Sequence, residues 1–302
     1  MGTSSSSKGS PSNVPMVPPW VADVPSETPS DSTDDIPPNE EPASAPRPLD
    51  GLDLVGTADE GDANAPLALP IDDKNRLAPT GRFSAARLDL RSFARNSDRQ
   101  AMRRGMRYYI SRGYGGSSMA THRMGGTIRS SETLFSAVSG ITGNPLQTPG
   151  APLDPTVLAG RSADDILDAV TDAVRPVDGT QDSESSRAAV RDALSDTLEK
   201  YPDADLLNLT DQQKEHAVEV FVSADIYGRF YLDLGTHVIE NAPSALAGLS
   251  RLKEIRDYIR ETVAETFRNL KSIGKSLSKS RVAAVVRDAI HETFEVFEGY
   301  TQ

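Results

Sequence analysis

Apolar side chains recur every three or four residues through the C-terminal part of the chain, and this spacing limits the fold more than any other feature. The first segment that follows it contains Leu252, Ile255, Ile259, Val263, Phe267 and Leu270. The second contains Val282, Val285, Ala289, Ile290, Phe294 and Phe297. Residues three or four apart share one face of an α-helix, so each segment predicts a helix with one buried face. No stretch alternates with the period of two that is typical of a half-buried strand, and an all-α helical domain is therefore expected.

Residues 1–80 lack the side chains that a packed core requires. They hold 14 of the 21 prolines and a single aromatic residue, Trp20. Proline, serine and carboxylate side chains cannot bury enough apolar surface to offset the entropy lost on ordering. We therefore expect a long, intrinsically disordered N-terminal tail in front of the helical domain.

Helical spacing begins near Ser92 and continues to the C-terminus. One helix is expected over 99–112, with Ser97 as its N-cap and Gly113 as its end. A second is expected within 121–139, and a loop follows to residue 155.

Two capping boxes mark the beginnings of later helices, at Ser162–Asp165 and at Thr210–Gln213. Apolar spacing predicts further helices at 190–201 and 230–238, the latter ending before Pro243. The expected organisation is a tail (1–80), a basic, glycine-containing helical segment (81–140), a linker (141–161) and an acidic helical domain (162–302).

Composition excludes several classes of protein. The chain has no cysteine, which removes disulfides and thiolate metal or catalytic sites. No apolar run is long enough to span a bilayer, and the first residues lack the basic and apolar regions of a secretory signal. A cytoplasmic protein without a membrane partner is expected.

No residue spacing predicts catalysis or metal binding. The four histidines lie on separate expected elements, and His291-Glu292 lacks the second histidine that a zinc-protease helix needs, because Glu295 holds that position. Gly274-Lys275-Ser276 resembles the end of a P-loop, but Asn269 stands where that motif has glycine. The residues of a Ser-His-Asp triad come together only in the folded chain, so their spacing in the sequence neither supports nor excludes one. The sequence contains no nucleophile-elbow motif that would support a triad. We expect no enzyme activity, no metal and no cofactor of the chain's own.

Arginines recur every four residues from position 87 to position 107. Residues 81–130 contain 11 arginines against two aspartates, whereas the segments on either side are acidic. The arginines that we expect to contact nucleic acid or a partner are Arg99, Arg103, Arg104, Arg107 and Arg112. The alternative is a solvated helix face that pairs with acidic groups of the same chain. The first interpretation makes the chain a nucleic-acid-binding module that uses the helix at 87–112.

The chain begins Met1-Gly2-Thr3-Ser4, so removal of Met1 exposes a glycine amine. Its ordinary pKa of about 7.7–8.0 leaves a useful fraction neutral and nucleophilic near neutral pH. The same residues match the N-myristoylation pattern, with Ser6 at the required position. A single acyl chain binds membranes only marginally, and the acidic tail adds no attraction to anionic lipid. An unmodified linker is the third alternative.

The chain resembles the QatB family of the bacterial Qat anti-phage defence system. The residues that carry the resemblance are Met1–Ser4, Pro15–Trp20, Tyr108–Ile110, Gly113–Ser118 and Arg123–Gly126. The acidic helices after Ile141 show no diagnostic motif.

This resemblance implies a non-catalytic defence protein with a modified N-terminus. The acceptor would be the Gly2 amine, which a QueC-like partner (QatC-like) acylates with a 7-deazaguanine group, and Thr3 and Ser4 would be recognised by that enzyme. ATP and zinc would belong to the partner. A QatA-like ATPase and a QatD-like nuclease, similar to TatD, are the other partners that the resemblance implies, and the helical body would dock them.

Overall fold

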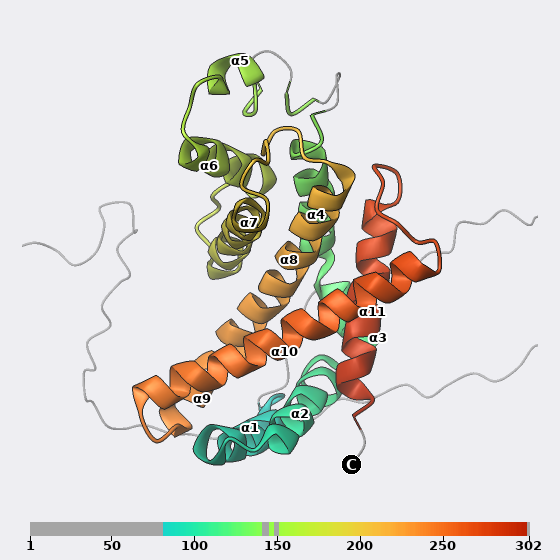
Figure 1. The fold of residues 1–302 in the computed structure, drawn as a ribbon. Helices are drawn as coiled ribbons and strands as arrows, with labels where there is room; N and C mark the ends of the chain where they lie inside the picture. Colours follow the sequence, from blue (N-terminus) through green and yellow to red (C-terminus); the bar gives the residue numbers. More distant parts are fainter. Residues whose placement is uncertain (1–80, 141–144, 148–150, 301–302) are drawn as a thin grey trace, which may run out of the picture. The chain divides into compact units, whose positions relative to one another are not determined.

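The computed structural model describes residues 81–140, 145–147 and 151–300 (Figure 1). The expected disordered tail lies outside these residues, as do Gly2, Thr3 and Ser4. By its contacts the chain divides between Pro70 and Ile71. The second unit contains every described residue.

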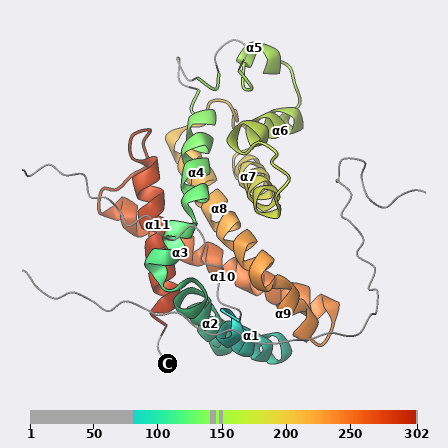
Figure 2. The same cartoon turned by 180° about the vertical axis from the view of Figure 1, so that it is seen from behind.

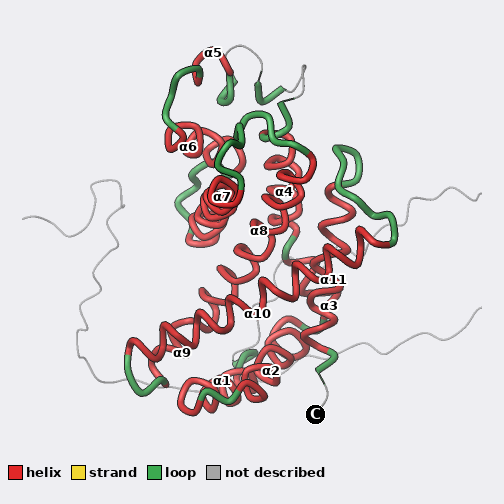
Figure 3. Tube along the Cα trace, viewed as in Figure 1, coloured by secondary structure: helices red, strands yellow, loops and turns green. Residues whose placement is uncertain are grey.

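The described residues form helices and loops and contain no strand (Figure 3), which confirms the predicted all-α class. The helices of the first part are α1 (Ser84–Asn96), α2 (Arg99–Tyr108), α3 (Ser117–Arg123) and α4 (Gly125–Ala137). The short α5 (Pro155–Leu158) lies within the predicted linker. The remaining helices are α6 (Ala163–Val174), α7 (Gln181–Lys200), α8 (Asp211–Phe230), α9 (Thr236–Asn241), α10 (Ala245–Ser272) and α11 (Val282–Glu298).

Helices α7 and α8 pack along each other, and α4 lies beside α8 in both views (Figures 1 and 2). The long α10 crosses α8 and also contacts α9 and α11. The pair α1 and α2 packs against α9, α10 and α11. The apolar residues that predicted α10 and α11 are buried where these helices meet, with Ile255, Ile259 and Val263 fully enclosed.

Both predicted capping boxes are present. The Ser162 hydroxyl accepts from the Asp165 backbone N–H at the start of α6, and the Asp165 carboxylate accepts from the Ser162 N–H in return. Thr210 and Gln213 make the same reciprocal pair at the start of α8. Each box satisfies two backbone donors that a helix N-terminus otherwise leaves unpaired.

The helix expected over 99–112 begins at Arg99 as predicted, but its predicted N-cap and its predicted end are wrong. A helix already occupies 84–96, and Ser97 ends it in a left-handed conformation with φ of 60°. Asp98 is the N-cap of α2, where its carboxylate accepts from the Gln100 N–H. At the other end, Gly113 lies buried inside a helical turn, and the chain leaves the helix at Gly115, with φ of 87°.

Two turns of π-helix interrupt the regular pattern of the described helices. The first, η1 (Tyr109–Tyr114), extends α2. The second, η2 (Tyr231–Gly235), joins α8 to α9, so the segment predicted at 230–238 continues an existing helix and ends at Asn241, before Pro243. The helix expected within 121–139 is divided at Met124 into α3 and α4.

One close backbone approach connects α4 to the loop before α8. Gly140 has φ of 57°, and a Cβ built on it would lie 2.5 Å from the Asn208 side chain. Next to it, the Leu209 N–H donates to the Val138 carbonyl, and Gln147 donates to the Ala137 carbonyl. Only glycine combines this conformation with this contact.

Candidate functional site

The predicted arginine contact residues are distributed over different neighbours. Arg104 lies against α1, where its Nε is 3.1 Å from a carboxylate oxygen of Asp89. Arg99 faces α10, with its Nε 3.7 Å from Glu254. These two arginines pair with acidic groups of the same chain, as the alternative interpretation of the arginine row expects.

The other three predicted arginines have no carboxylate within 4 Å among the described residues. The Arg103 guanidinium lies 5.9 Å from the Tyr258 ring centre and 5.5 Å from that of Tyr300. Arg112 lies 4.7 Å above the Tyr108 ring. Arg107 is partly exposed. The apolar residues of the same segment, Met102, Met106, Tyr109 and Ile110, are buried.

The histidines make separate contacts. His216 is hydrogen-bonded to Asp196, with 2.8 Å between Nε2 and Oδ2, and His237 lies 2.9 Å from the Arg87 carbonyl. His291 Nε2 is 3.4 Å from a Glu295 carboxylate oxygen, at the position where a zinc-protease helix has its second histidine. In the part of the chain that the structure describes, no group of three or more histidine, aspartate or glutamate side chains could hold a metal ion.

The two π-helical turns meet at a cluster that sequence spacing does not reveal. Tyr109 and Tyr114 both donate to the same oxygen of Asp233, at 2.9 and 2.7 Å. Arg82 lies 3.5 Å from the other carboxylate oxygen. Asp233 is 119 and 124 residues away from the two phenols, so only the folded chain brings them together.

The π-helical geometry of η1 explains why both phenols reach one carboxylate. Residues five apart on an α-helix point about 140° away from each other, because each residue turns by 100°. A π-helix pairs residue i with residue i+5, and this brings Tyr109 and Tyr114 closer to the same side of the helix than an α-helix would. The two rings lie edge to face, 5.1 Å apart, and Phe83 stacks on Tyr109 at 5.3 Å.

Burial raises the pKa of both phenols well above the ordinary value, and the Asp233 carboxylate raises each pKa further. Both tyrosines therefore stay protonated and act as hydrogen-bond donors at physiological pH. Tyr109 is only 3% exposed. This cluster ties α2 and η1 to η2, and its geometry is that of a structural anchor.

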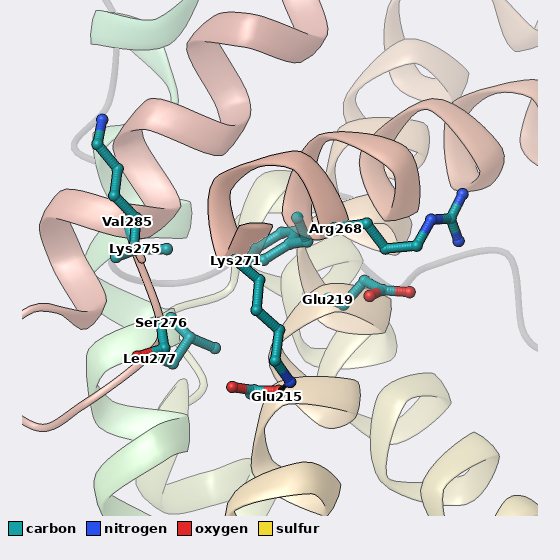
Figure 4. Close-up of a pocket in the computed structure, with 9 residues that line it drawn as sticks. Glu215, Glu219, Arg268, Lys271, Lys275, Ser276, Leu277 and Val285 are labelled. Carbon is teal, nitrogen blue, oxygen red and sulfur yellow. Dashed lines mark hydrogen bonds and ion pairs between the residues drawn. The ribbon is translucent and has the colours of Figure 1, made fainter. Parts of the chain in front are cut away.

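A small pocket of about 140 Å³ lies between α8, α10 and the segment before α11 (Figure 4). Lys271 pairs with Glu215 across it, and Lys275 pairs with Asp288 at 2.7 Å. Burial raises the pKa of the Glu219 carboxyl, although the nearby cations oppose the shift. The three cations of the pocket each pair with a carboxylate, Lys271 within the lining and Lys275 and Arg268 with Asp288 and Glu265 outside it.

Among the described helices, none combines the length and the apolar composition needed to cross a bilayer.

Comparison with known proteins identifies the family. Residues 115–297, more than half of the chain, match the sequence model described as "Qat anti-phage system associated protein QatB". No curated protein and no solved structure shows significant similarity to the chain. The match overlaps the residues that carried the predicted resemblance only at 115–118 and 123–126, and it lies mainly in the acidic helices where no motif was recognised. The chain therefore belongs to the QatB family and is a component of the Qat anti-phage system.

Proposed function

We propose that this protein is a non-catalytic component of Qat anti-phage defence whose Gly2 amine is acylated with a 7-deazaguanine group by a QueC-like partner. The observation that carries the proposal is the QatB match over residues 115–297, together with the Met1-Gly2-Thr3-Ser4 start. The helical body docks partner proteins in this scheme.

The chemistry needs only an amine from this chain. The partner activates the carboxylate of a deazaguanine acid with ATP, and the neutral Gly2 amine attacks the activated acyl carbon. A C–N bond forms, the bond to the ATP-derived leaving group breaks, and the amine loses a proton to give an amide. Because the amine has an ordinary pKa of about 7.7–8.0, roughly a quarter of it is neutral at pH 7.4. Thr3 and Ser4 are the residues that the partner enzyme recognises, and ATP and zinc are held by that enzyme.

The helical body offers exposed apolar side chains for docking. Leu246 and Leu249 at the start of α10 are 79% and 58% exposed, and Tyr231 and Leu232 of η2 are also exposed. A hollow lined by Tyr227, Tyr231 and Leu249 adjoins them. Exposed apolar groups next to a hollow are typical of protein interaction sites. The partners are the QatC-like enzyme, the QatA-like ATPase and the QatD-like nuclease.

Mass analysis of the N-terminal peptide tests the modification. The protein is made alone and together with its operon neighbours, as the natural sequence and as Gly2→Pro. Gly9→Pro is the matched control, because it introduces a proline into the same segment and leaves the Gly2 amine unchanged. We expect the deazaguanine acyl mass only on co-expressed natural and Gly9→Pro protein. A bare Gly2 in the co-expressed sample would refute the proposal, and an acyl-chain mass would favour myristoylation.

One observation favours the second candidate, a nucleic-acid-binding surface. Arg87, Arg91 and Arg95 are exposed on one face of α1, and within the described residues none has a carboxylate within 4 Å. Exchange of Arg91 and Arg95 for glutamate should weaken binding to DNA or RNA and reduce its dependence on salt. Equal binding by this variant and the natural protein would exclude the surface. The double variant with Lys253→Glu and Lys279→Glu, at two exposed positions outside α1, makes the same change in total charge and is the control.

A further inference from the structure

Three guanidinium groups and one enclosed carboxylate face a hollow that no step of the proposed function uses. The hollow lies between the start of α4, the start of α7 and the end of α8, and it has room of about 80 Å³. Arg123, Arg175 and Arg229 supply the guanidinium groups, and Asp225 supplies the carboxylate. Every lining residue falls within the segment that matches the QatB family.

The guanidinium groups of this hollow are unequally paired with carboxylates of the chain. Arg229 pairs with Asp182 at 2.6 Å. Arg175 is 3.9 Å from Asp178, a side chain that is half exposed. Arg123 has no carboxylate within 4 Å in the part of the chain that is described. Since arginine stays protonated in proteins, the guanidinium groups of Arg123 and Arg175 keep donors available for a ligand.

The hollow is also polar where most ligand pockets are apolar. Among its described lining residues Leu232 is the one large apolar side chain, and hydroxyl groups line much of the remainder. The Thr127 hydroxyl donates to Asp225 Oδ2, and enclosure raises the pKa of the Asp225 carboxyl. A buried carboxylate can only accept hydrogen bonds, so it favours a ligand that can donate one.

We propose that this hollow binds a phosphate group that carries a proton. Its charged oxygens lie against the guanidinium groups of Arg123 and Arg175, and its P–OH donates to Asp225. Guanidinium forks match the geometry of an oxyanion, and the room suits an ion the size of several water molecules. Sulfate has the same shape but no proton at neutral pH, so Asp225 repels it. The phosphate is either the free ion, which keeps a proton at neutral pH, or the end of a small phosphorylated metabolite, whose ester phosphate has a second pKa of about 6 and binds here as the monoanion.

Calorimetric titration of the full chain at constant ionic strength and about pH 6, where both phosphate probes carry a proton, tests the site with inorganic phosphate, sulfate and ribose 5-phosphate. We expect phosphate to bind and sulfate to bind at least tenfold more weakly. Tighter binding of ribose 5-phosphate would indicate a phosphorylated metabolite, and weaker binding would indicate the free ion. Equal binding of sulfate and phosphate, or no binding of either phosphate probe, would overturn the proposal.

Variants distinguish the site from general charge effects. Loss of a charged hydrogen bond corresponds to roughly tenfold or more in affinity, so Arg123→Gln and Arg175→Gln should each weaken phosphate binding by that factor. Arg129→Gln is the matched control, because Arg129 is exposed on α4 outside the hollow. An equal loss in Arg129→Gln would refute the site. Asp225→Asn should gain affinity for sulfate, a change that misfolding cannot produce, and unchanged sulfate binding in this folded variant would show that Asp225 does not select the ligand.

Discussion

Replacing Asp233 by asparagine tests whether the carboxylate between the two π-helical turns stabilises the fold. Both Tyr109 and Tyr114 donate to this carboxylate, at 2.9 and 2.7 Å. A hydrogen bond to a charged acceptor contributes about 1.5–3 kcal/mol, whereas one to a neutral acceptor contributes about 0.5–1.5 kcal/mol. Weakening two such bonds should therefore lower the free energy of unfolding by about 2–3 kcal/mol. For a body of this size, that loss lowers Tm by about 4–12 °C.

Thermal and urea unfolding, followed by circular dichroism at 222 nm, measure this effect. Asp257→Asn is the matched control, because Asp257 pairs with Lys253 on the exposed side of α10. An exposed pair one helical turn apart contributes only about 0.3–0.5 kcal/mol. If Asp233→Asn unfolds at the same urea concentration as Asp257→Asn, the cluster contributes nothing beyond a surface ion pair, and the stabilising role inferred for its charged hydrogen bonds is wrong.

Three further predictions concern stability. Folding raises the pKa of the Tyr109 and Tyr114 phenols, so the unfolded chain loses these protons at a lower pH than the folded chain does. The free energy of unfolding should therefore be constant up to about pH 10 and fall above it. Urea titrations between about pH 8 and 11 would show this fall, which should be less steep in Tyr114→Phe. Gly113→Ala should lower the free energy of unfolding by about 1–3 kcal/mol, because its Cβ would lie 2.4 Å from the buried Phe83 ring. The Cβ of Gly126→Ala meets no atom within 4 Å, so this control should be neutral or stabilising in the same assay. Thr210→Ala removes an N-cap and should cost about 1 kcal/mol; no change in its unfolding midpoint would show that the capping box is dispensable.

Helices whose signals are local could be predicted from the sequence. The two capping boxes lie within four residues each, and the spacing of α10 and α11 repeats over several turns. Local hydrogen bonds and a single buried face decide such elements, so their prediction required no knowledge of the neighbours. The class of the fold followed from these helices alone.

Boundaries that depend on distant residues could not be predicted. Gly113 resembles a helix end, yet it is buried because the Phe83 ring packs against it. Ser97 resembles an N-cap, yet it ends the helix that begins at Ser84. The π-helical turns exist where Asp233 receives Tyr109 and Tyr114, a contact across more than a hundred residues. No spacing in the sequence encodes these pairings.

The arginine row shows the same division between local and distant information. Its four-residue spacing indicated either a contact surface or a helix face that pairs with acidic groups of the same chain. It did not indicate that Arg104 meets Asp89 on α1 or that Arg99 meets Glu254 on α10. Whether an arginine serves the fold or a partner depends on the carboxylates that the tertiary structure supplies.

The segment that matches the QatB family is not by itself the folded unit. It begins at residue 115 and includes Asp233, but the phenols of Tyr109 and Tyr114, which both donate to that carboxylate, precede it. Without them Asp233 would lose both phenol donors, and the buried Phe230 ring would lose the Tyr109 ring that packs edge to face on it at 5.4 Å. The arginine-rich helices α1 and α2 therefore belong to the body in physical terms. Any role of their exposed arginines in defence is exerted from a surface that the matched segment holds in place.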